Sequence, residues 1–197
     1  RILRELQIAA EVQQPETDGH YYFSCYPYDP ELKIYPYEEK LDRWRVYIKG
    51  LEGTPYANKW WYILVTFPPL YPVEPPAFRF ISIPYHLNVS SEGHICHRII
   101  EKDYLPTKKI VEILQDLREL FLIPSVETPI QMDVSELFQC NYDEYLRLAR
   151  KSANDNAKDN YEEYLERDSV CDEVSANYSV ESTNHIPPYM RSSISLF

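Results

Sequence analysis

The stretch YPVEPPAFRFISIPYHLNVSSEGHIC, residues 71–96, places one thiol at the end of a proline-rich crossing and a short loop. Within it, AFRFISI puts Phe78 and Phe80 on one side of an extended chain and the following isoleucines on the other, which predicts a strand. Residues 90–93, Ser-Ser-Glu-Gly, form a polar, turn-prone approach to Cys96. The thiol is therefore expected to be reachable, although a single cysteine taken alone is more often a small, partly buried hydrophobic residue.

The chain before this stretch carries the patterns of one helix and several strands. Residues 1–14 have apolar side chains mostly three or four positions apart until Pro15, which predicts a short amphipathic helix. Residues 44–48 alternate and residues 60–67 form a nearly continuous apolar run, which predicts two antiparallel strands joined by a turn. Clusters around HYYFSCY, residues 20–26, predict one more strand and a long irregular connection.

The second half of the chain is predicted to be helical. Apolar residues between 110 and 121 recur at helical spacing, with Thr107 as the expected cap. Asp133 and Asn141 each precede a glutamate by three positions, which predicts two more helix starts, and the last helix is expected to reach about Leu165. The fold class is therefore α+β, with an N-terminal helix, a four-stranded antiparallel meander sheet and C-terminal helices.

Length and composition indicate one globular domain with additional segments. The 197 residues are 44% apolar, and 16 Pro and 18 Tyr against 4 Gly indicate stiff, aromatic-rich packing. We expect a core at residues 1–150 with an insertion at about 16–42, a helical extension at 151–167, and an acidic, flexible tail at 168–197. The absence of an initiator methionine suggests an excised domain or a processed chain.

Charge and cysteine usage argue against several classes of protein. A net charge of −11 opposes binding to a nucleic-acid backbone, which requires clustered lysine and arginine. No apolar run reaches the length of a membrane span, and the first residues are not signal-like. The cysteines are scattered without a Cys-x-x-Cys pair, so a reducing compartment fits better than a disulfide framework or a four-thiolate zinc site. They are Cys25, Cys96, Cys140 and Cys171.

The joint spacing of four motifs resembles the ubiquitin-conjugating (E2) enzyme family. That family has a Tyr-Pro-x-x-Pro-Pro crossing, a His-Pro-Asn triplet, and an active-site cysteine eight residues after the asparagine; here His86-Leu87-Asn88 follows the crossing and Cys96 has that spacing. Tyr104-Leu105-Pro106 is similar to the family's Trp-Ser-Pro, and residues 124–129 to its Pro-Asn-Pro-x-Asp-Pro loop. The resemblance covers roughly residues 1–150, and it is that of a divergent member, with His-Leu-Asn in place of His-Pro-Asn.

The resemblance implies a reaction and a set of partners. The thiolate of Cys96 would accept ubiquitin, or a ubiquitin-like protein, as a thioester from an activating enzyme (E1) and pass it to a lysine of a protein substrate or to a ligase (E3). No cofactor is expected in this chain, because ATP is used by the activating enzyme. Such an enzyme works in the cytoplasm or the nucleus, with neither nucleic acid nor a membrane as a partner.

The resemblance also implies roles around the thiol. Asn88 matches the residue that donates a hydrogen bond to the thioester oxygen as charge develops, and it is equally suited to fixing its own loop. His86 matches a histidine that packs the loop. Thr128 stands where many members have an acid that orients and deprotonates the incoming lysine, and Glu127, one residue earlier, is a candidate replacement for that acid.

Other positions depart from the family pattern. Leu87 lacks the fixed φ of the usual proline and adds a backbone donor. His97 and Arg98 follow the cysteine, where a positive neighbour would lower the pKa of the thiol. The surface that faces E1 and E3 in the family corresponds here to Arg1, Arg4, Val73 and Pro106. Val73 stands where many members have phenylalanine.

Three alternatives compete with this interpretation. Cys96 with neighbouring histidines suggests a cysteine–histidine hydrolase, but no third group orients a histidine. A zinc site is hindered because His94, Cys96 and His97 lie too close together along one extended segment, so no metal is expected. The main alternative is a catalytically inactive module of the same fold that binds ubiquitin or a ligase, and Leu87 and Thr128 favour it.

Overall fold

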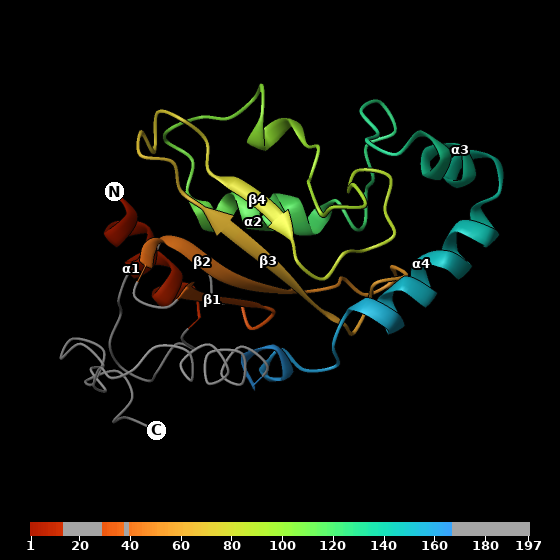
Figure 1. The fold of residues 1–197 in the computed structure, drawn as a ribbon, viewed down its shortest axis with the longest axis horizontal. Coiled ribbons are helices and arrows are strands. Elements are labelled where there is room, and N and C mark those ends of the chain that lie inside the picture. The colour runs from red at the N-terminus through yellow and green to blue at the C-terminus, as the bar shows by residue number, and fades with distance from the viewer. Residues whose placement is uncertain (14–28, 38–39, 167–197) are drawn as a thin grey trace, which may run out of the picture. The chain divides into compact units, whose positions relative to one another are not determined.

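The protein is described here from a computed structural model, which covers residues 1–13, 29–37 and 40–166. The chain divides into two compact units, residues 1–161 and 162–197. The first unit contains an N-terminal helix, a four-stranded antiparallel sheet and then helices (Figure 1), so the predicted α+β fold class is confirmed. Its elements are α1 (Ile2–Val12), β1 (Leu32–Tyr37), β2 (Lys40–Lys49), β3 (Trp60–Thr66), β4 (Ala77–Phe80), η1 (Arg98–Ile100), α2 (Ile110–Glu119), α3 (Met132–Cys140) and α4 (Tyr142–Asn156).

The sheet is a meander in the order β1-β2-β3-β4 with every neighbouring pair antiparallel. Ile34, Val46, Ile63 and Phe80 lie opposite one another across the four strands, and all four are buried. The apolar side of α2, predicted from its helical spacing, packs in the same core as these residues, and Figure 1 shows α2 behind the sheet. One face of the sheet and one side of α2 therefore form the core.

Two of the expected element boundaries are wrong, and one is confirmed. Helix α2 begins at Ile110 with Lys109 as its cap, not at Thr107. The reason is tertiary: the first amide of α2, that of Ile110, donates to Glu5 of α1 at 3.1 Å, so the helix starts where this acceptor lies. Helix α3 begins two residues before its expected start and is capped by Gln131, whereas Asn141 caps α4 as predicted, accepting from the amide of Glu144.

The predicted continuous last helix is also wrong, because α4 ends at Asn156. The backbone beyond it pairs with the sheet: Trp60 donates to the Lys158 carbonyl at 2.7 Å and Lys158 donates back at 3.2 Å. The Tyr161 ring then packs on Trp60 and Tyr47, with centroids 5.1 Å and 6.1 Å away. Within the predicted extension, residues 157–160 therefore have extended or bent backbone, and the chain is helical again at 162–166.

Among its described residues, the predicted insertion at 16–42 contains the edge strand β1 at Leu32–Tyr37 and the first residues of β2, which begins at Lys40. In β1, Leu32 and Ile34 are buried against β2. The cluster HYYFSCY lies outside the described residues, as does the predicted tail at 168–197.

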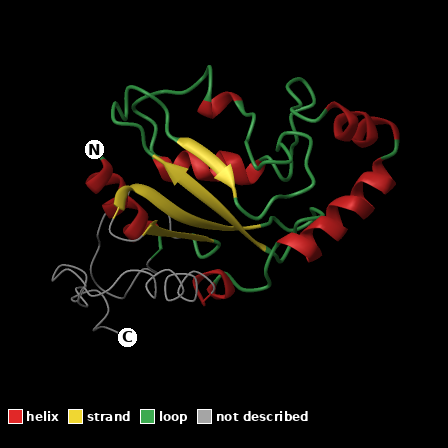
Figure 2. Ribbon diagram, in the orientation of Figure 1, coloured by secondary structure: helices red, strands yellow, loops and turns green. Residues whose placement is uncertain are grey.

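The connection from β4 to α2 carries the thiol and contains only the short helix η1, as Figure 2 shows. It is anchored at Gly93, which has φ +85° and whose carbonyl accepts from the Phe80 amide at 2.8 Å. A Cβ at this position would lie 2.0 Å from the Phe80 carbonyl oxygen. Only glycine fits here, because the backbone is left-handed and touches the end of β4.

Gly93→Ala should therefore destabilise the protein far more than a left-handed φ alone would. Gly53 supplies the matched control, since it has φ +80° but nothing within 4 Å of an added Cβ. We expect Gly53→Ala to lower the free energy of unfolding by about 1 kcal/mol, and Gly93→Ala by at least about 2 kcal/mol more. Urea denaturation of the two variants measures the difference; equal losses would show that the contact with β4 is unimportant.

Candidate active site

Cys96 lies directly after two isolated β-bridges that fix its segment, Arg79 with His94 and Val89 with Ile95. Its amide donates to the Asn88 carbonyl at 2.9 Å, and its side chain is partly exposed. The Tyr71–Pro72 bond in the preceding crossing is cis. The thiol is thus partly accessible, as predicted. The segment that leads into it is fixed by the two β-bridges and by the bond to Asn88.

The pKa of the Cys96 thiol is raised, first because the group is partly buried and then because the Glu101 carboxylate lies beside it. Lys102 and a hydrogen bond from Thr128 act in the opposite direction on this pKa without reversing it. The resting group is therefore a neutral thiol. Deprotonation must accompany any attack by this sulfur, since the thiolate is the nucleophile.

The two residues after the cysteine do not lower the pKa of its thiol. His97 Nδ1 accepts from the Ile99 amide at the start of η1, and burial lowers the pKa of His97, so its ring is neutral. Arg98 pairs with Asp103 at 2.5 Å. Both side chains shape the turn that follows the thiol rather than supplying it with a positive neighbour.

The Asn88 side chain joins the thiol's segment to the loop at 125–128. Its Nδ2 donates to the carbonyls of Ser125 at 2.8 Å and Thr128 at 3.0 Å, and its Oδ1 accepts from the Ser125 amide at 2.9 Å. The residue is fully buried. Both amide hydrogens are thus engaged, so in this state the loop-fixing role is the one occupied, and an oxyanion bond requires one of these hydrogens to be released.

His86 is fully buried, and both of its ring nitrogens are engaged. Nδ1 accepts from the Asn88 amide at 3.0 Å, which leaves Nε2 to donate to the Leu120 carbonyl at 3.0 Å. Burial lowers the pKa of His86 to about 4. The ring is therefore neutral and joins the loop to the end of α2, as the resemblance implied. Neither nitrogen is open to a metal ion or to the thiol.

Leu87, which stands in place of the family's proline, is also fully buried. Its carbonyl accepts from the amides of Ile130 at 2.8 Å and Gln131 at 3.1 Å. The Gln131 side chain in turn donates to the Val89 carbonyl. Burial and these hydrogen bonds, rather than a proline ring, therefore order the triplet.

The two candidates for the missing acid differ in position. Thr128 is partly buried, its hydroxyl lies 3.0 Å from that of Ser125, and it donates to the Cys96 sulfur. Glu127 is exposed and is not among the groups that act on the thiol. Glu101, which sequence reasoning missed, is the carboxylate that raises the pKa of the Cys96 thiol. The available signal was an acid five residues after Cys96, in a turn that returns toward it.

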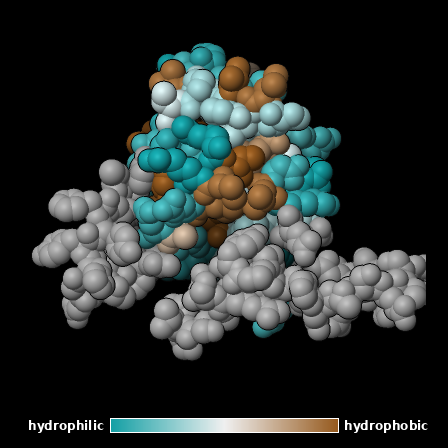
Figure 3. Space-filling view, turned by 90° about the vertical axis from the view of Figure 1, so that its left-hand side faces the viewer, coloured by the Kyte–Doolittle hydropathy of each residue, from teal (hydrophilic) through white to brown (hydrophobic). Residues whose placement is uncertain are grey.

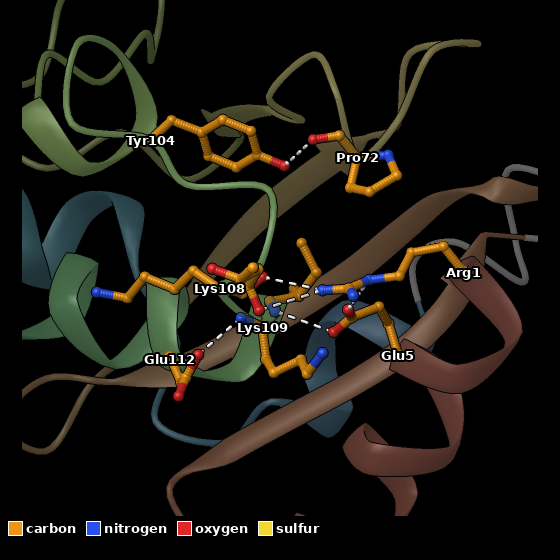
Figure 4. A network of polar contacts seen from close by, with 9 residues as sticks. Arg1, Glu5, Pro72, Tyr104, Lys108, Lys109 and Glu112 are labelled. Carbon is orange, nitrogen blue, oxygen red and sulfur yellow. Dashed lines mark hydrogen bonds and ion pairs between the residues drawn. The ribbon is translucent and has the colours of Figure 1, made fainter.

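Three segments far apart in sequence meet at the side of the molecule where α1 begins, the face seen in Figure 3. Tyr104 donates to the Pro72 carbonyl at 2.9 Å, and Arg1 donates to the Thr107 and Lys108 carbonyls at 3.4 Å and 3.3 Å (Figure 4). Arg1 also pairs with the buried Glu5 at 2.7 Å. Arg1 therefore connects α1 to the loop before α2.

The same segments present apolar side chains to solvent, and Figure 3 shows hydrophobic surface gathered near the centre of this face. Val73 is 75% exposed, and Arg4 and Pro106 are exposed as well. The exposed apolar residues of these segments are Leu3, Leu70, Val73 and Leu105. Arg4, Val73 and Pro106, three of the four residues predicted to face E1 and E3, are thus exposed, and Arg1 is bound to the loop before α2.

Two searches of the described residues bear on other classes of site. No group of three or more His, Cys, Asp or Glu side chains in residues 1–13, 29–37 and 40–166 is arranged to hold a metal ion. Within the same residues, no helix has both the length and the apolar character that spanning a membrane requires. Cys96 and Cys140 are free thiols there, while Cys25 and Cys171 lie outside the described part of the chain.

Comparison with known proteins identifies this arrangement as an E2 domain. The E2 domain of a Toxoplasma gondii ubiquitin conjugating enzyme superposes with a TM-score of 0.67 at 25% identity, over 79% of this chain and 98% of that one. A family model described as ubiquitin-conjugating enzyme matches residues 7–153. The chain therefore belongs to the ubiquitin-conjugating enzyme family.

Two of the similar curated proteins are named ubiquitin-conjugating enzymes, and a third is named as a bifunctional E2/E3 enzyme. Ubiquitin-conjugating enzyme E2 2 of Kluyveromyces lactis is 27% identical over 71% of this chain and 85% of that protein. Ubiquitin-conjugating enzyme E2 S of Aquarana catesbeiana is 34% identical over 63% of this chain and 59% of that protein. A probable bifunctional E2/E3 enzyme of Acanthamoeba polyphaga mimivirus is 32% identical over 55% of this chain, which spans only 8% of the viral protein.

The lowered pKa of His86 predicts a stability that depends on pH. Because the folded pKa of about 4 lies below the ordinary 6.5, the contribution is complete above pH 6.5 and is lost as pH falls toward 4. Between pH 7 and pH 5 this one residue should remove about 2 kcal/mol of unfolding free energy. Urea denaturation at both pH values measures the loss, which His86→Gln should reduce and the exposed His94→Gln should leave intact. An NMR titration placing the His86 pKa near 6.5 would contradict this.

The contacts of Asn88 predict that its removal loosens the loop at 125–128. Asn88→Ala deletes the acceptor of the Ser125 amide and the donor to two carbonyls, which should lower the unfolding free energy by about 2 kcal/mol or more. Hydrogen exchange at the Ser125 amide should become faster by about tenfold or more. An Asn88→Ala protein with unchanged exchange at Ser125 would show that the loop is held by other contacts.

Proposed function

We propose that this chain is an active E2 enzyme that accepts ubiquitin, or a ubiquitin-like protein, from an E1 as a thioester on Cys96 and transfers it to a substrate lysine or to an E3. The observation that carries the proposal is the position of the thiol: it is partly exposed, it is bound through its amide to Asn88, and the loop that Asn88 holds supplies a hydroxyl to the sulfur. A cysteine kept only for packing would need none of these contacts.

Loading the thiol requires little help from the site. The Cys96 thiolate attacks the thioester of the modifier on E1, a new carbon–sulfur bond forms, and the E1 cysteine leaves as a thiolate that takes up a proton. The two thioesters have similar energies, and a cysteine thiol reacts even when only a small fraction is ionised. ATP is consumed by E1, so this chain needs no cofactor of its own for the exchange.

Transfer to an amine makes greater demands on the site. Negative charge grows on the thioester oxygen as the amine attacks, and a nearby donor that is held rigidly lowers the energy of that state. Asn88 matches the position that supplies this donor in the family, and Thr128 presents a hydroxyl from the loop at 125–128. Either group can serve as an oxyanion donor only while a thioester is under attack, because the resting thiol has no oxyanion to stabilise.

The alternative, an inactive binding module, has two observations in its favour. The raised pKa of Cys96 and the absence of an acid at position 128 both disfavour the chemistry of a typical member. Under this alternative the fold and the face at α1 remain available to partners, while no modifier is carried. The two functions therefore differ in one measurable product, a covalent adduct at Cys96.

The test is to incubate the chain with an E1, ATP and ubiquitin and to separate the products on a non-reducing gel. The parent should give an adduct that thiol reagents remove, and Cys96→Ser should give one that resists them, because an oxygen ester has replaced the thioester. Cys140→Ser, at an exposed cysteine outside the site, should load like the parent. Absence of any adduct across ubiquitin and ubiquitin-like modifiers would support the inactive module instead.

A further inference from the structure

Three aromatic side chains are buried on the face of the sheet that points away from the core. Tyr47, Trp60 and Tyr62 are at most 9% exposed, but they do not belong to the core cluster, whereas Val46 and Ile48 on either side of Tyr47 do. Neighbouring residues of a strand point to opposite faces, so the three rings lie on the outer face of the sheet. An antiparallel sheet commonly leaves that face to solvent. These rings are instead covered.

The chain that follows α4 supplies part of the cover, and we call its residues 157–161, Ala-Lys-Asp-Asn-Tyr, the docking segment. Asn156 anchors the end of α4 by donating to the Ile83 carbonyl at 2.8 Å, and Figure 1 shows this end of the helix beside the start of β3. Strand β4 pairs with the second half of β3, and two backbone hydrogen bonds join Trp60, in the first half, to Lys158. The docking segment therefore extends the sheet by one residue.

The ring of Tyr161 holds the docking segment on the outer face. Its centroid lies 5.1 Å from that of Trp60 and 6.1 Å from that of Tyr47, and the Lys33 Nζ lies 5.8 Å from the same centroid. Contacts between aromatic rings, and a cation above a ring, each stabilise a docked side chain beyond the area that it buries. One partly buried tyrosine thus contacts β1, β2 and β3 together.

The charges at this contact are complementary. Asp159 of the docking segment pairs with Lys59, which directly precedes β3, at 2.6 Å. The Asp159 side chain is 82% exposed, so this ion pair orients the segment more than it stabilises it. The sheet brings Lys33 and Lys59 to the contact, in a chain whose net charge is −11. The site is therefore basic and aromatic, and it fits a segment that is acidic and aromatic.

We propose that the outer face around Trp60 is a docking site for a short extended segment that carries an acid two positions before an aromatic ring, and that residues 157–161 occupy it as its resident ligand. In recognition of this kind, pairing with the backbone of a strand gives affinity, and side-chain contacts give specificity. Here Trp60 supplies the backbone, Lys59 selects the acid, and the outer-face rings select the aromatic side chain. The inference goes beyond the chemistry of Cys96 and does not depend on it.

The resident segment closes the site to other chains. Because it follows α4 directly, its effective concentration at the site is on the order of millimolar or higher. Its contacts are nevertheless few, since Asp159 is exposed and Tyr161 is only partly buried, so the segment is able to detach while the core stays folded. A partner with a segment of the same chemistry therefore reaches Trp60 by displacing Tyr161.

The first measurement is amide hydrogen exchange in the full chain. In the parent, the Trp60 amide, which donates to the Lys158 carbonyl, should exchange about tenfold or more faster than the amide of Trp61, which lies opposite Ile48 within the β2–β3 ladder. Tyr161→Ala should speed exchange at Trp60 by about tenfold or more, because the ring that holds the segment is lost. Tyr161→Phe, the matched control, keeps the ring and should stay within about twofold of the parent.

The second measurement supplies the segment as a separate molecule. The probe is the peptide of residues 155–162, Asp-Asn-Ala-Lys-Asp-Asn-Tyr-Glu, at about 5 mM, which is comparable to the effective concentration of a linked segment. The peptide should slow Trp60 exchange in Tyr161→Ala by about threefold or more and leave the parent unchanged. The same peptide with alanine in place of its tyrosine should have no effect on either protein.

Three results would overturn the docking site. They are an exchange rate at Trp60 that Tyr161→Ala does not raise, equal exchange at Trp60 and Trp61 in the parent, and a tyrosine peptide without effect on the variant. None of these readouts uses ubiquitin or Cys96, so the docking site is tested separately from the proposed function.

Discussion

The hydrogen bonds of the Asn88 side chain are the constraint on which the rest of the site depends. A buried amide must satisfy its donors and acceptor, and Asn88 does so with the backbone of Ser125 and Thr128, two residues of a distant loop. The same residue accepts the amide of Cys96 through its own carbonyl. One asparagine thus fixes the separation between the thiol and the opposite wall, and His86 anchors that asparagine to the end of α2.

The pKa of the thiol depends on the groups around it. Thr128, on the loop that Asn88 holds, favours the thiolate, while Glu101, on the turn after η1, disfavours it. The net result is a protonated sulfur at rest, which is protected from oxidation because the thiolate is the susceptible form. A site arranged for fast loading would have placed a cation at position 101.

Sequence reasoning reached the fold because its signals are local. The alternation of β2 and β4, the apolar run of β3 and the spacing of α1 and α2 reflect periods that burial imposes on each element separately. The motif spacing likewise placed Cys96, Asn88 and His86 in one site. The start of α2 and the end of α4 were missed because Glu5 and Trp60 determine them from over ninety residues away in sequence. The effect of Glu101 on the pKa of the thiol was missed for a related reason: it depends on a turn whose geometry no spacing rule encodes.

The departure at Leu87 shows how such a scaffold tolerates change. A proline fixes its own φ and removes a donor, so it orders a loop without help from neighbours. Leucine at this position is ordered by its surroundings: it is fully buried, and its carbonyl holds the chain leading into α3. A loop conformation that is fixed by packing depends on the core, whereas one that is fixed by a proline ring depends only on that residue. The geometry of this site therefore depends on the stability of the whole domain, and a distant variant that destabilises the core should disturb the site as well.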